Sequence, residues 1–281
     1  MLAPAAGFVL AFNYWPLART VWLSLHTTDL FGRTGEFTGA DNFTEMLSSG
    51  AFWHSMLVTL AFTAGSVGTK LVLGLLIAVP LASRARGTVL ARAVVLVPMA
   101  VSVAVAGLVF RTLFQPGFGL VDQALASVGV PSPGWLTNPD TALTTVIIVD
   151  GWAGLGFTVL ILLAALGAVP DEVVEAARLD GAGPIRRTWS VLLPLISPSV
   201  FFLMIVQTVD AIREFTVINV VTGGGPADAT RTLVMDVWLR AFGPAGGDYG
   251  PASARALVLL LLVGVITAIQ FGVVEKRVHY R

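Results

Sequence analysis

Long stretches of apolar residues dominate the chain. A transmembrane helix needs about 20 mostly apolar residues to cross a hydrocarbon core of roughly 30 Å. Six segments meet this requirement: residues 2–25, 52–82, 90–113, 141–168, 191–219 and 254–274. The pattern predicts an all-α integral membrane protein, with six transmembrane helices in a single domain over residues 1–281.

The positions of Lys and Arg predict how these helices are oriented. Nine basic residues lie in one set of connections and the C-terminal tail: Arg84, Arg86, Arg92, Arg178, Arg186, Arg187, Lys276, Arg277 and Arg281. At most six lie on the opposite side: Arg19, Arg33, Arg111, Arg231, Arg240 and Arg255. Because cytoplasmic loops carry the excess of basic residues, we expect both termini in the cytoplasm.

Composition excludes several other functions. Charged residues make up only 12% of the chain, against about 25% in soluble domains. The 17 basic and 17 acidic residues balance, which gives no reason to expect nucleic-acid binding. There is no Cys, and the three His residues are not at metal-ligand spacing, so we expect no metal site. No nucleotide-binding Gly-x-x-x-x-Gly-Lys-Ser/Thr string occurs either.

The loop of residues 169–190, between the fourth and fifth predicted spans, carries signals for two short helices. Pro170 suits a first helical turn, and Asp171 and Glu172 follow it where the helix dipole favours carboxylates. Gly181 and Gly183 are expected to end the first helix, because glycine accepts the positive φ of a helix C-terminus. The second helix would then run from residue 184 to about residue 189.

The same loop carries a family signature. Glu175-Ala176-Ala177 is followed after three residues by Gly181, and an aliphatic-x-Leu-Pro ending closes at Pro194. This string resembles the signature loop of permeases from bacterial ABC importers. The resemblance implies that the loop is a coupling helix that seats in an ATPase subunit, through Glu175, Ala176, Ala177, Asp180, Gly181 and Pro194. The alternative is an ordinary amphipathic connector.

The resemblance also implies an assembly. It predicts the type I importer permease fold in the bacterial inner membrane, a second homologous permease, two ATPase subunits and an extracytoplasmic substrate-binding protein. ATP and Mg²⁺ would be bound by the ATPase subunits, so this chain is expected to be non-catalytic and to hold no cofactor.

Further strings narrow the resemblance. Residues 22–25, 41–43, 150–152 and 222–226 are similar to the carbohydrate-uptake branch of these permeases. Residues 180–187 and 270–278 resemble the A-type permease subunits of sn-glycerol-3-phosphate importers. The substrate this implies is sn-glycerol-3-phosphate or a glycerophosphodiester. The alternatives are a neutral oligosaccharide, or an ion-coupled secondary transporter that uses Asp150 or Asp210 as its coupling site.

Ionisable residues at membrane depth are candidates for the substrate path, because such residues usually face a cavity or each other. Asp210, Arg213 and Glu214 lie in the outer half of the fifth predicted span. In one interpretation Arg213 meets an anionic or polyhydroxyl substrate. In the other, Asp210 and Arg213 neutralise each other from one helix face.

Asp150 and Trp152, in the fourth predicted span, are a second candidate pair, since an indole and a carboxylate suit a sugar-like ligand. The alternative for Asp150 is a buried carboxylate bonded to a neighbouring helix. Lys70 is expected to snorkel or to form a structural ion pair, and Asn219 and Gln207 are further cavity candidates. Six glycines are expected to let helices approach closely: Gly65, Gly68, Gly74, Gly151, Gly154 and Gly156.

Overall fold

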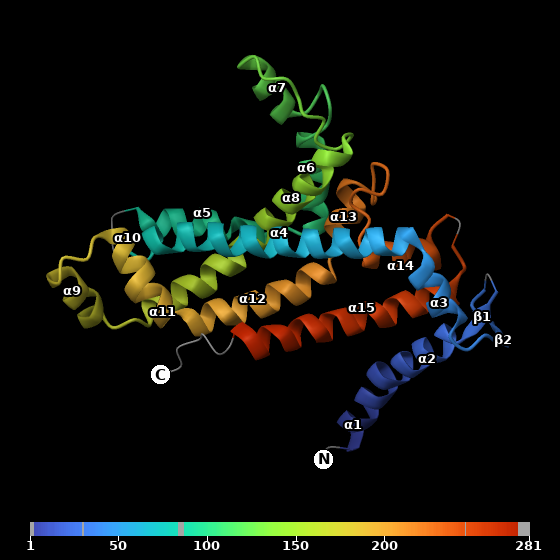
Figure 1. The fold of residues 1–281 in the computed structure, drawn as a ribbon. Coiled ribbons are helices and arrows are strands. Elements are labelled where there is room, and N and C mark those ends of the chain that lie inside the picture. Colours follow the sequence, from blue (N-terminus) through green and yellow to red (C-terminus); the bar gives the residue numbers. More distant parts are fainter. Residues whose placement is uncertain (1–2, 30, 84–86, 245, 275–281) are drawn as a thin grey trace. The chain divides into compact units, whose positions relative to one another are not determined.

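The computed structural model of the chain describes residues 3–29, 31–83, 87–244 and 246–274 (Figure 1). The chain forms two compact units. The first contains residues 1–60 and 231–265, and the second contains residues 61–230 and 266–281. Two long helices, α4 (Gly50–Leu81) and α15 (Tyr249–Ile269), contribute residues to both units.

The first unit begins with a helical segment and a small hairpin. Besides its parts of α4 and α15, the unit contains α1 (Ala3–Val9), the π-helical turn η1 (Leu10–Tyr14), α2 (Trp15–Ser24), β1 (His26–Thr28), β2 (Thr34–Phe37), α3 (Asp41–Ser48) and α14 (Leu233–Phe242). The two strands are antiparallel, with His26 opposite Phe37. Met46, Phe52 and Leu233 form the buried core, and the backbone N–H of Leu233 donates to the Thr59 hydroxyl at 2.9 Å.

A buried carboxylate ties the two C-terminal helices of the first unit together. Asp236 on α14 lies 2.8 Å from Nε of Arg255 on α15, and both side chains are buried. Arg231 and Arg240 lie 2.5 and 3.4 Å from the same carboxylate. Three of the six basic residues predicted on the outer side are therefore ion-paired with this one carboxylate.

The second unit is built around α8 (Pro139–Gly167). Its other elements are α5 (Thr88–Ala100), α6 (Val103–Leu113), α7 (Leu120–Ser127), α9 (Asp171–Leu179), α10 (Pro184–Arg187), η2 (Thr188–Leu192), α11 (Leu193–Leu195), α12 (Ser197–Ile212), α13 (Thr216–Val221) and η3 (Gln270–Val274). Buried Ala78, Val159, Leu162, Ile196 and Leu203 form its core. Within this unit, α7 lies beyond one end of α8 and α9 beyond the other (Figure 1).

Glycines set the close packing of α4 against α8. A Cβ on Gly74 would lie 2.6 Å from Cγ2 of Thr158, and one on Gly65 would lie 2.6 Å from Cδ1 of Ile147. A Cβ would lie 2.7 Å from Lys70 at Gly154 and 3.0 Å from Thr69 at Gly151, and Gly156 is crowded by Met99 of α5 at 2.7 Å, so the expectation of close helix approach is confirmed for these three as well. It is wrong for Gly68, where a Cβ would meet nothing within 4 Å.

The long apolar helices agree only in part with the six predicted spans. Among the described residues, three helices are long and apolar enough to cross a membrane: α4, α8 and the helix over Tyr249–Val273. Two bent pairs raise this number to five if each is one span. The first predicted span is helical over Ala3–Ser24 but is interrupted by η1 and is not among them. Six spans therefore remain a prediction.

The third and fifth predicted spans are not straight. Helices α5 and α6 meet at 100°, because Val101 and Ser102 both have extended backbone, with ψ of 133° and 134°. The helical segment Pro184–Leu195 meets α12 at 73°. Pro198 stands just inside the start of α12, where proline suits a new helix but cannot donate to the preceding turn.

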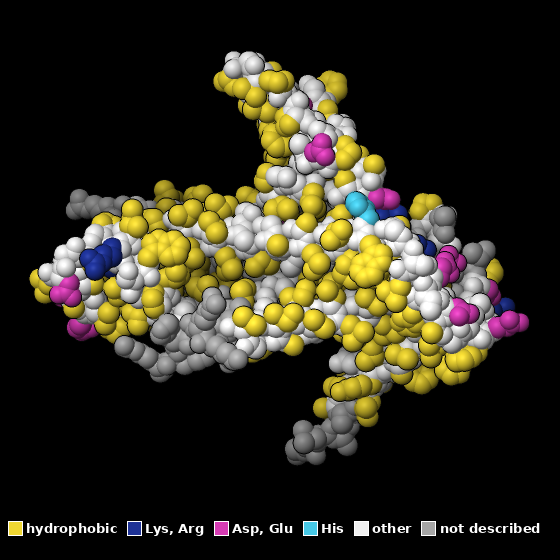
Figure 2. Space-filling view, in the orientation of Figure 1, with side chains coloured by type: hydrophobic (Ala, Val, Ile, Leu, Met, Phe, Trp, Pro, Cys, Tyr) yellow, Lys and Arg dark blue, Asp and Glu magenta, His cyan; other side chains and the backbone are white. Residues whose placement is uncertain are grey.

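The surface of the isolated chain is strongly apolar. Figure 2 shows hydrophobic side chains spread over the visible flanks of the helices. On α4, for example, Leu57, Val72 and Leu76 are more than half exposed. Exposed apolar surface on this scale is typical of contact with lipid or with another membrane subunit.

Candidate substrate cavity and coupling loop

A cavity of about 420 Å³ opens within the second unit, between α4, α6, α8 and α12. Four of the predicted substrate-path residues line it: Asp150, Asp210, Arg213 and Glu214. Gln207, a further predicted cavity candidate, also lines it, and the lining is completed by Lys70, Val103, Ala153, Gly154 and Phe157. The structure thus brings together charged residues that lie up to 144 positions apart in the sequence, from Lys70 to Glu214.

One wall of the cavity is a buried ion pair. Nζ of Lys70 on α4 lies 2.7 Å from Oδ2 of Asp150 on α8, and both side chains are at least nine-tenths buried. The hydroxyl of Ser66, one helical turn before Lys70, donates to the same oxygen. The structural ion pair expected for Lys70 is therefore confirmed, and Asp150 is bonded to a neighbouring helix. Both charges are satisfied before any ligand enters.

Gly154 makes this pair possible. A Cβ at position 154 would lie 2.7 Å from Cε and 3.2 Å from Nζ of Lys70. Any side chain at position 154 would therefore require the Lys70 stem to shift while Nζ keeps its contact with Asp150. A second polar contact joins α12 to α8: Nε2 of Gln207 donates to the Thr158 hydroxyl at 3.0 Å.

The other wall is formed at a break in the fifth predicted span. Helix α12 ends at Ile212, and α13 begins at Thr216. Asp210 and Arg213 are exposed in the isolated chain. Oε1 of Glu214 accepts a hydrogen bond from the backbone N–H of Val217 at 2.7 Å, so this carboxylate caps α13. Non-helical backbone at membrane depth is tolerated where it lines a cavity, as it does here.

Asp210 and Arg213 do not neutralise each other. In the parts of the chain that the structure describes, no ion pair joins them, although both line the cavity. The expectation of a self-neutralising pair is therefore wrong. Arg213 follows the last turn of α12, where its charge complements the negative end of the helix dipole, and its guanidinium is left available to a ligand.

Two predicted candidates lie outside the cavity lining. Trp152 packs edge-on against Phe110, with ring centroids 5.1 Å apart, and Asn219 on α13 is not a lining residue. Helix geometry gives the reason for Trp152, since residues two apart on a helix do not share a face. Phe157 is seven residues after Asp150 and does share its face, so it is the aromatic residue of this wall.

The loop of residues 169–190, for which the sequence predicts a coupling role and which is called the coupling loop below, folds as two short helices at the opposite end of α8 from α7 (Figure 1). Helix α9 begins at Asp171, directly after Pro170, and ends at Leu179. Gly181 has φ +75°, and the N–H of Ala182 donates to the Ala177 carbonyl at 3.0 Å, so the predicted glycine stop is confirmed there. The expectation for Gly183 is wrong: its φ is −63°, and it precedes α10.

The signature residues of this loop divide between surface and interior. Glu175, Ala176, Asp180 and Gly181 are exposed, whereas Ala177 is buried. Pro194 lies in α11, at the far end of the π-helical turn. Three large apolar side chains next to the signature are strongly exposed: Leu179 is 89%, Ile185 78% and Trp189 67% exposed. This loop therefore presents apolar surface beside a flat stretch of small residues.

The connection between α6 and α8 is held by Asp122. Its carboxylate accepts from the Ser132 hydroxyl at 2.7 Å and from the N–H of Gly117 at 3.1 Å. The Ser132 hydrogen bond, followed by that of Gly117, lowers the pKa of Asp122, since both favour the ionised form.

Comparisons with known proteins agree on one class of protein. Residues 70–280 match the family described as "Binding-protein-dependent transport system inner membrane component". The chain is 38% identical over 282 residues to the sn-glycerol-3-phosphate transport system permease protein UgpA of Yersinia pestis bv. Antiqua (strain Antiqua), covering 100% of this chain and 95% of that relative. The protein of the same name from Brucella abortus biovar 1 (strain 9-941) is 35% identical over 283 residues, with the same coverage.

Solved structures show the same fold. A chain in the crystal structure of a bacterial alginate ABC transporter, in complex with an alginate pentasaccharide-bound periplasmic protein, superposes with a TM-score of 0.84. It is 19% identical, and the superposition covers 100% of this chain and 95% of that chain. A second structure, of a bacterial ABC transporter involved in the import of alginate, gives a TM-score of 0.83 at 21% identity over 98% of this chain and 94% of that chain.

Proposed function

Because this chain belongs to the family of binding-protein-dependent transport system inner membrane components, we propose that it is one of two membrane subunits of an ATP-driven importer for a glycerophosphate-type solute. The family assignment confirms the resemblance carried by Glu175, Gly181 and Pro194, and with it the multi-pass inner-membrane fold. The proposed partners are a second homologous permease, two ATPase subunits that bind ATP and Mg²⁺, and an extracytoplasmic binding protein.

The coupling loop supports the ATPase partners. Leu179, Ile185 and Trp189 expose apolar surface on a short polypeptide loop, and burial of such surface against a partner favours association. Small residues at positions 176 and 181 leave the backbone of α9 accessible to a groove. In this proposal ATP binding draws the two coupling loops together, and the membrane cavity opens to the outer side. The proposal also places both termini in the cytoplasm, as the distribution of basic residues predicts.

The single observation that carries the substrate class is the identity of 35 to 38% to relatives named as sn-glycerol-3-phosphate permeases. The cavity is compatible with this solute. Arg213 offers a guanidinium that forms no ion pair with a carboxylate of the described residues, and guanidinium groups bind phosphate through paired hydrogen bonds. Asp210 and Glu214 offer carboxylate oxygens that can accept from the glycerol hydroxyls.

A neutral oligosaccharide is the second candidate, and the cavity charge favours it. The lining holds two cations, Lys70 and Arg213, and three carboxylates, Asp150, Asp210 and Glu214. With all of them ionised, the formal charge contributed by this chain is −1. This charge opposes a phosphate everywhere except beside Arg213, whereas a neutral sugar is indifferent to it.

Uptake by the complex in proteoliposomes separates the candidates. The complex is purified through a tag on this chain, supplied with its binding protein, and given radiolabelled sn-glycerol-3-phosphate or a neutral oligosaccharide. ATP-dependent uptake of the phosphate ester supports the proposal. Uptake of the sugar alone assigns the second candidate, and uptake driven by an ion gradient without ATP contradicts both.

Arg213→Ala tests the role of the cavity. Hydrogen bonds to charged groups contribute about 1.5–3 kcal/mol, so we expect at least a tenfold weaker response to the phosphate ester. The thermal stability of the complex should stay unchanged, because Arg213 has no carboxylate to leave unpaired. Arg213→Lys, which keeps the charge, should recover part of the uptake. A loss of stability that Asp210→Asn reverses would instead assign Arg213 a structural role.

A further inference from the structure

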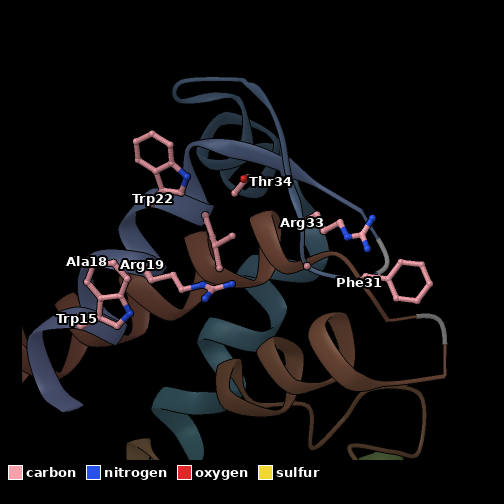
Figure 3. A pocket seen from close by; sticks show the side chains of 9 residues that line it. Trp15, Ala18, Arg19, Trp22, Phe31, Arg33 and Thr34 are labelled. Atoms are coloured by element: carbon pink, nitrogen blue, oxygen red, sulfur yellow. The ribbon is translucent and has the colours of Figure 1, made fainter. Parts of the chain in front are cut away.

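A cavity of about 700 Å³ lies beside α2 in the first unit and has no part in the pathway described above. It is lined by Trp15, Arg19 and Trp22 of α2, and by Phe31, Gly32 and Arg33 of the turn between β1 and β2. Figure 3 shows Arg19 between the two indoles on one side and the turn that carries Phe31 and Arg33 on the other.

Hydrogen bonds within the turn that closes this cavity hold its backbone in one conformation. Oδ1 of Asp29 accepts from the backbone N–H groups of Phe31 at 3.0 Å and Arg33 at 2.7 Å. The N–H of Asp29 donates to the Arg33 carbonyl at 3.0 Å. Gly32 has φ +73°, and a Cβ there would lie 3.4 Å from the Tyr249 ring. The position of Arg33 is therefore fixed by its own backbone and by α15.

Both arginines of the cavity carry uncompensated charge. Within the described residues, no carboxylate forms an ion pair with Arg19 or Arg33. The nearest acid on the turn, Asp29, has an oxygen committed to two backbone N–H groups and does not line the cavity. Arg33 stacks 6.0 Å from the Phe31 ring centroid, which orients the guanidinium without neutralising it.

The position of the cavity on α2 points to the membrane boundary. Arg19 stands five residues before the end of α2 at Ser24, about 7 to 8 Å along the helix. Trp15 and Trp22 are 67% and 57% exposed, and tryptophans are enriched where hydrocarbon meets lipid headgroups. Arg19 therefore lies on the same helix as two exposed indoles, a composition typical of the membrane–water interface, where phospholipids carry their phosphates.

We propose that this cavity binds the phosphate headgroup of an anionic phospholipid, with Arg19 and Arg33 as its cationic ligands. The indoles of Trp15 and Trp22 would contact the glycerol backbone and the first part of the acyl chains. An anionic lipid matches the excess of positive charge, whereas a zwitterionic lipid brings its own cation. The site would anchor the first helical segment to the adjoining leaflet.

Native mass spectrometry of the purified complex tests this site. The complex is exchanged into micelles that contain equal amounts of phosphatidylglycerol and phosphatidylcholine with identical acyl chains. We expect phosphatidylglycerol to be retained selectively. Each basic residue near a membrane surface contributes about fivefold in affinity for anionic lipid, so Arg19→Gln with Arg33→Gln should reduce the selectivity by more than tenfold.

Arg111→Gln is the matched control. Arg111 is exposed, lies in the last turn of α6 in the second unit and does not line the cavity, and its removal changes the net charge by the same amount per site. It should leave lipid retention unchanged. Equal retention of both lipids by the unaltered complex, or an equal loss in Arg111→Gln, would overturn the proposal. Displacement of the lipid by millimolar soluble sn-glycerol-3-phosphate would overturn it too, because the occupant would then be a free phosphate ester.

If the double variant does not assemble, Arg33→Gln alone decides the question. Arg33 is exposed and lies on the turn, so its substitution leaves the helix intact. A drop of about fivefold in phosphatidylglycerol retention supports the site, and no drop contradicts it.

Discussion

Gly181 offers a sharp test of the coupling loop, because the chain contains a second glycine in the same local structure. Gly181 follows α9 with φ +75°, and Gly129 follows α7 with φ +73°. In each case the residue after the glycine donates to the carbonyl five positions back, at 3.0 Å from Ala182 and 2.9 Å from Val130. A Cβ at either glycine would meet nothing within 4 Å.

The magnitude follows from backbone strain alone. A residue with a Cβ in the left-handed region costs about 1–2 kcal/mol, so Gly181→Val and Gly129→Val should strain their helix ends equally. That cost shifts the population of the native turn by about 5- to 30-fold. The two variants should therefore have the same effect on the thermal stability of the complex, and that effect should be small, since each strains only one exposed turn.

Their effects on coupling should differ. Receptor-stimulated ATPase activity in proteoliposomes should fall severalfold in Gly181→Val, because the strained turn and the added isopropyl group both oppose seating of α9 in the ATPase. It should stay within experimental error in Gly129→Val, which changes the loop on the opposite end of α8. Equal loss in both variants, or full stimulation in Gly181→Val, would refute the assignment of this loop.

Three further predictions concern the ion pair, the outer loop and the orientation. Lys70→Met should lower the melting temperature of the complex, because it leaves buried Asp150 unpaired at a cost of about 3–5 kcal/mol; addition of Asp150→Asn should restore most of it, and no recovery would contradict the pairing. The lowered pKa of Asp122 means that its contribution to loop stability is complete above its ordinary pKa near 3.8 and is lost as the pH falls through the lower folded value. Protease resistance of residues 115–139 should therefore drop only in that acidic range; a drop that begins near neutral pH would be inconsistent. A cysteine at Ala227 should react with an impermeant reagent added outside cells and one at Ser190 should not, in a chain with no Cys of its own; the reverse labelling would invert the predicted orientation.

The coupling loop could be predicted well because its signals are local. Pro170, the acidic first turn and Gly181 act within a few residues of one another, and the structure has the expected helix between them. Gly183 shows where local reasoning fails. Two glycines near a helix end both permit a positive φ, but only one can occupy the terminal position. Gly181 occupies it, and Gly183 instead directly precedes α10.

The cavity could be predicted only in part. Hydropathy and charge identified Asp150, Asp210, Arg213 and Glu214, since ionisable groups in apolar segments are rare. The partner of Asp150 could not be predicted, because Ser66 lies 84 residues away and the contact depends on how α4 packs on α8. Phe157 could have been found from its position seven residues after Asp150; the choice of Trp152 followed sequence adjacency instead of the helix face.

The bends in the third and fifth predicted spans could not be predicted from the apolar pattern. Hydropathy measures how long a segment is and how apolar it is, and the extended backbone at Val101 and Ser102 changes neither. Such a segment has the same hydropathy profile whether it is straight or turns by 100°. The direction of a helix is set by backbone dihedrals and by packing, so the hydropathy pattern locates the apolar segments but does not give their course.

The contact between Gly154 and Lys70 constrains how this protein can evolve. A methyl group at position 154 would lie 2.7 Å from Cε of Lys70, so an alanine there requires the lysine side chain to shift or to be replaced by a shorter residue. Loss of the lysine leaves the buried carboxylate of Asp150 without its cation, so Asp150 must then be replaced by an uncharged residue. Substitutions at Lys70 and Asp150 are therefore coupled, and we expect homologues that have lost the lysine to have lost the carboxylate as well.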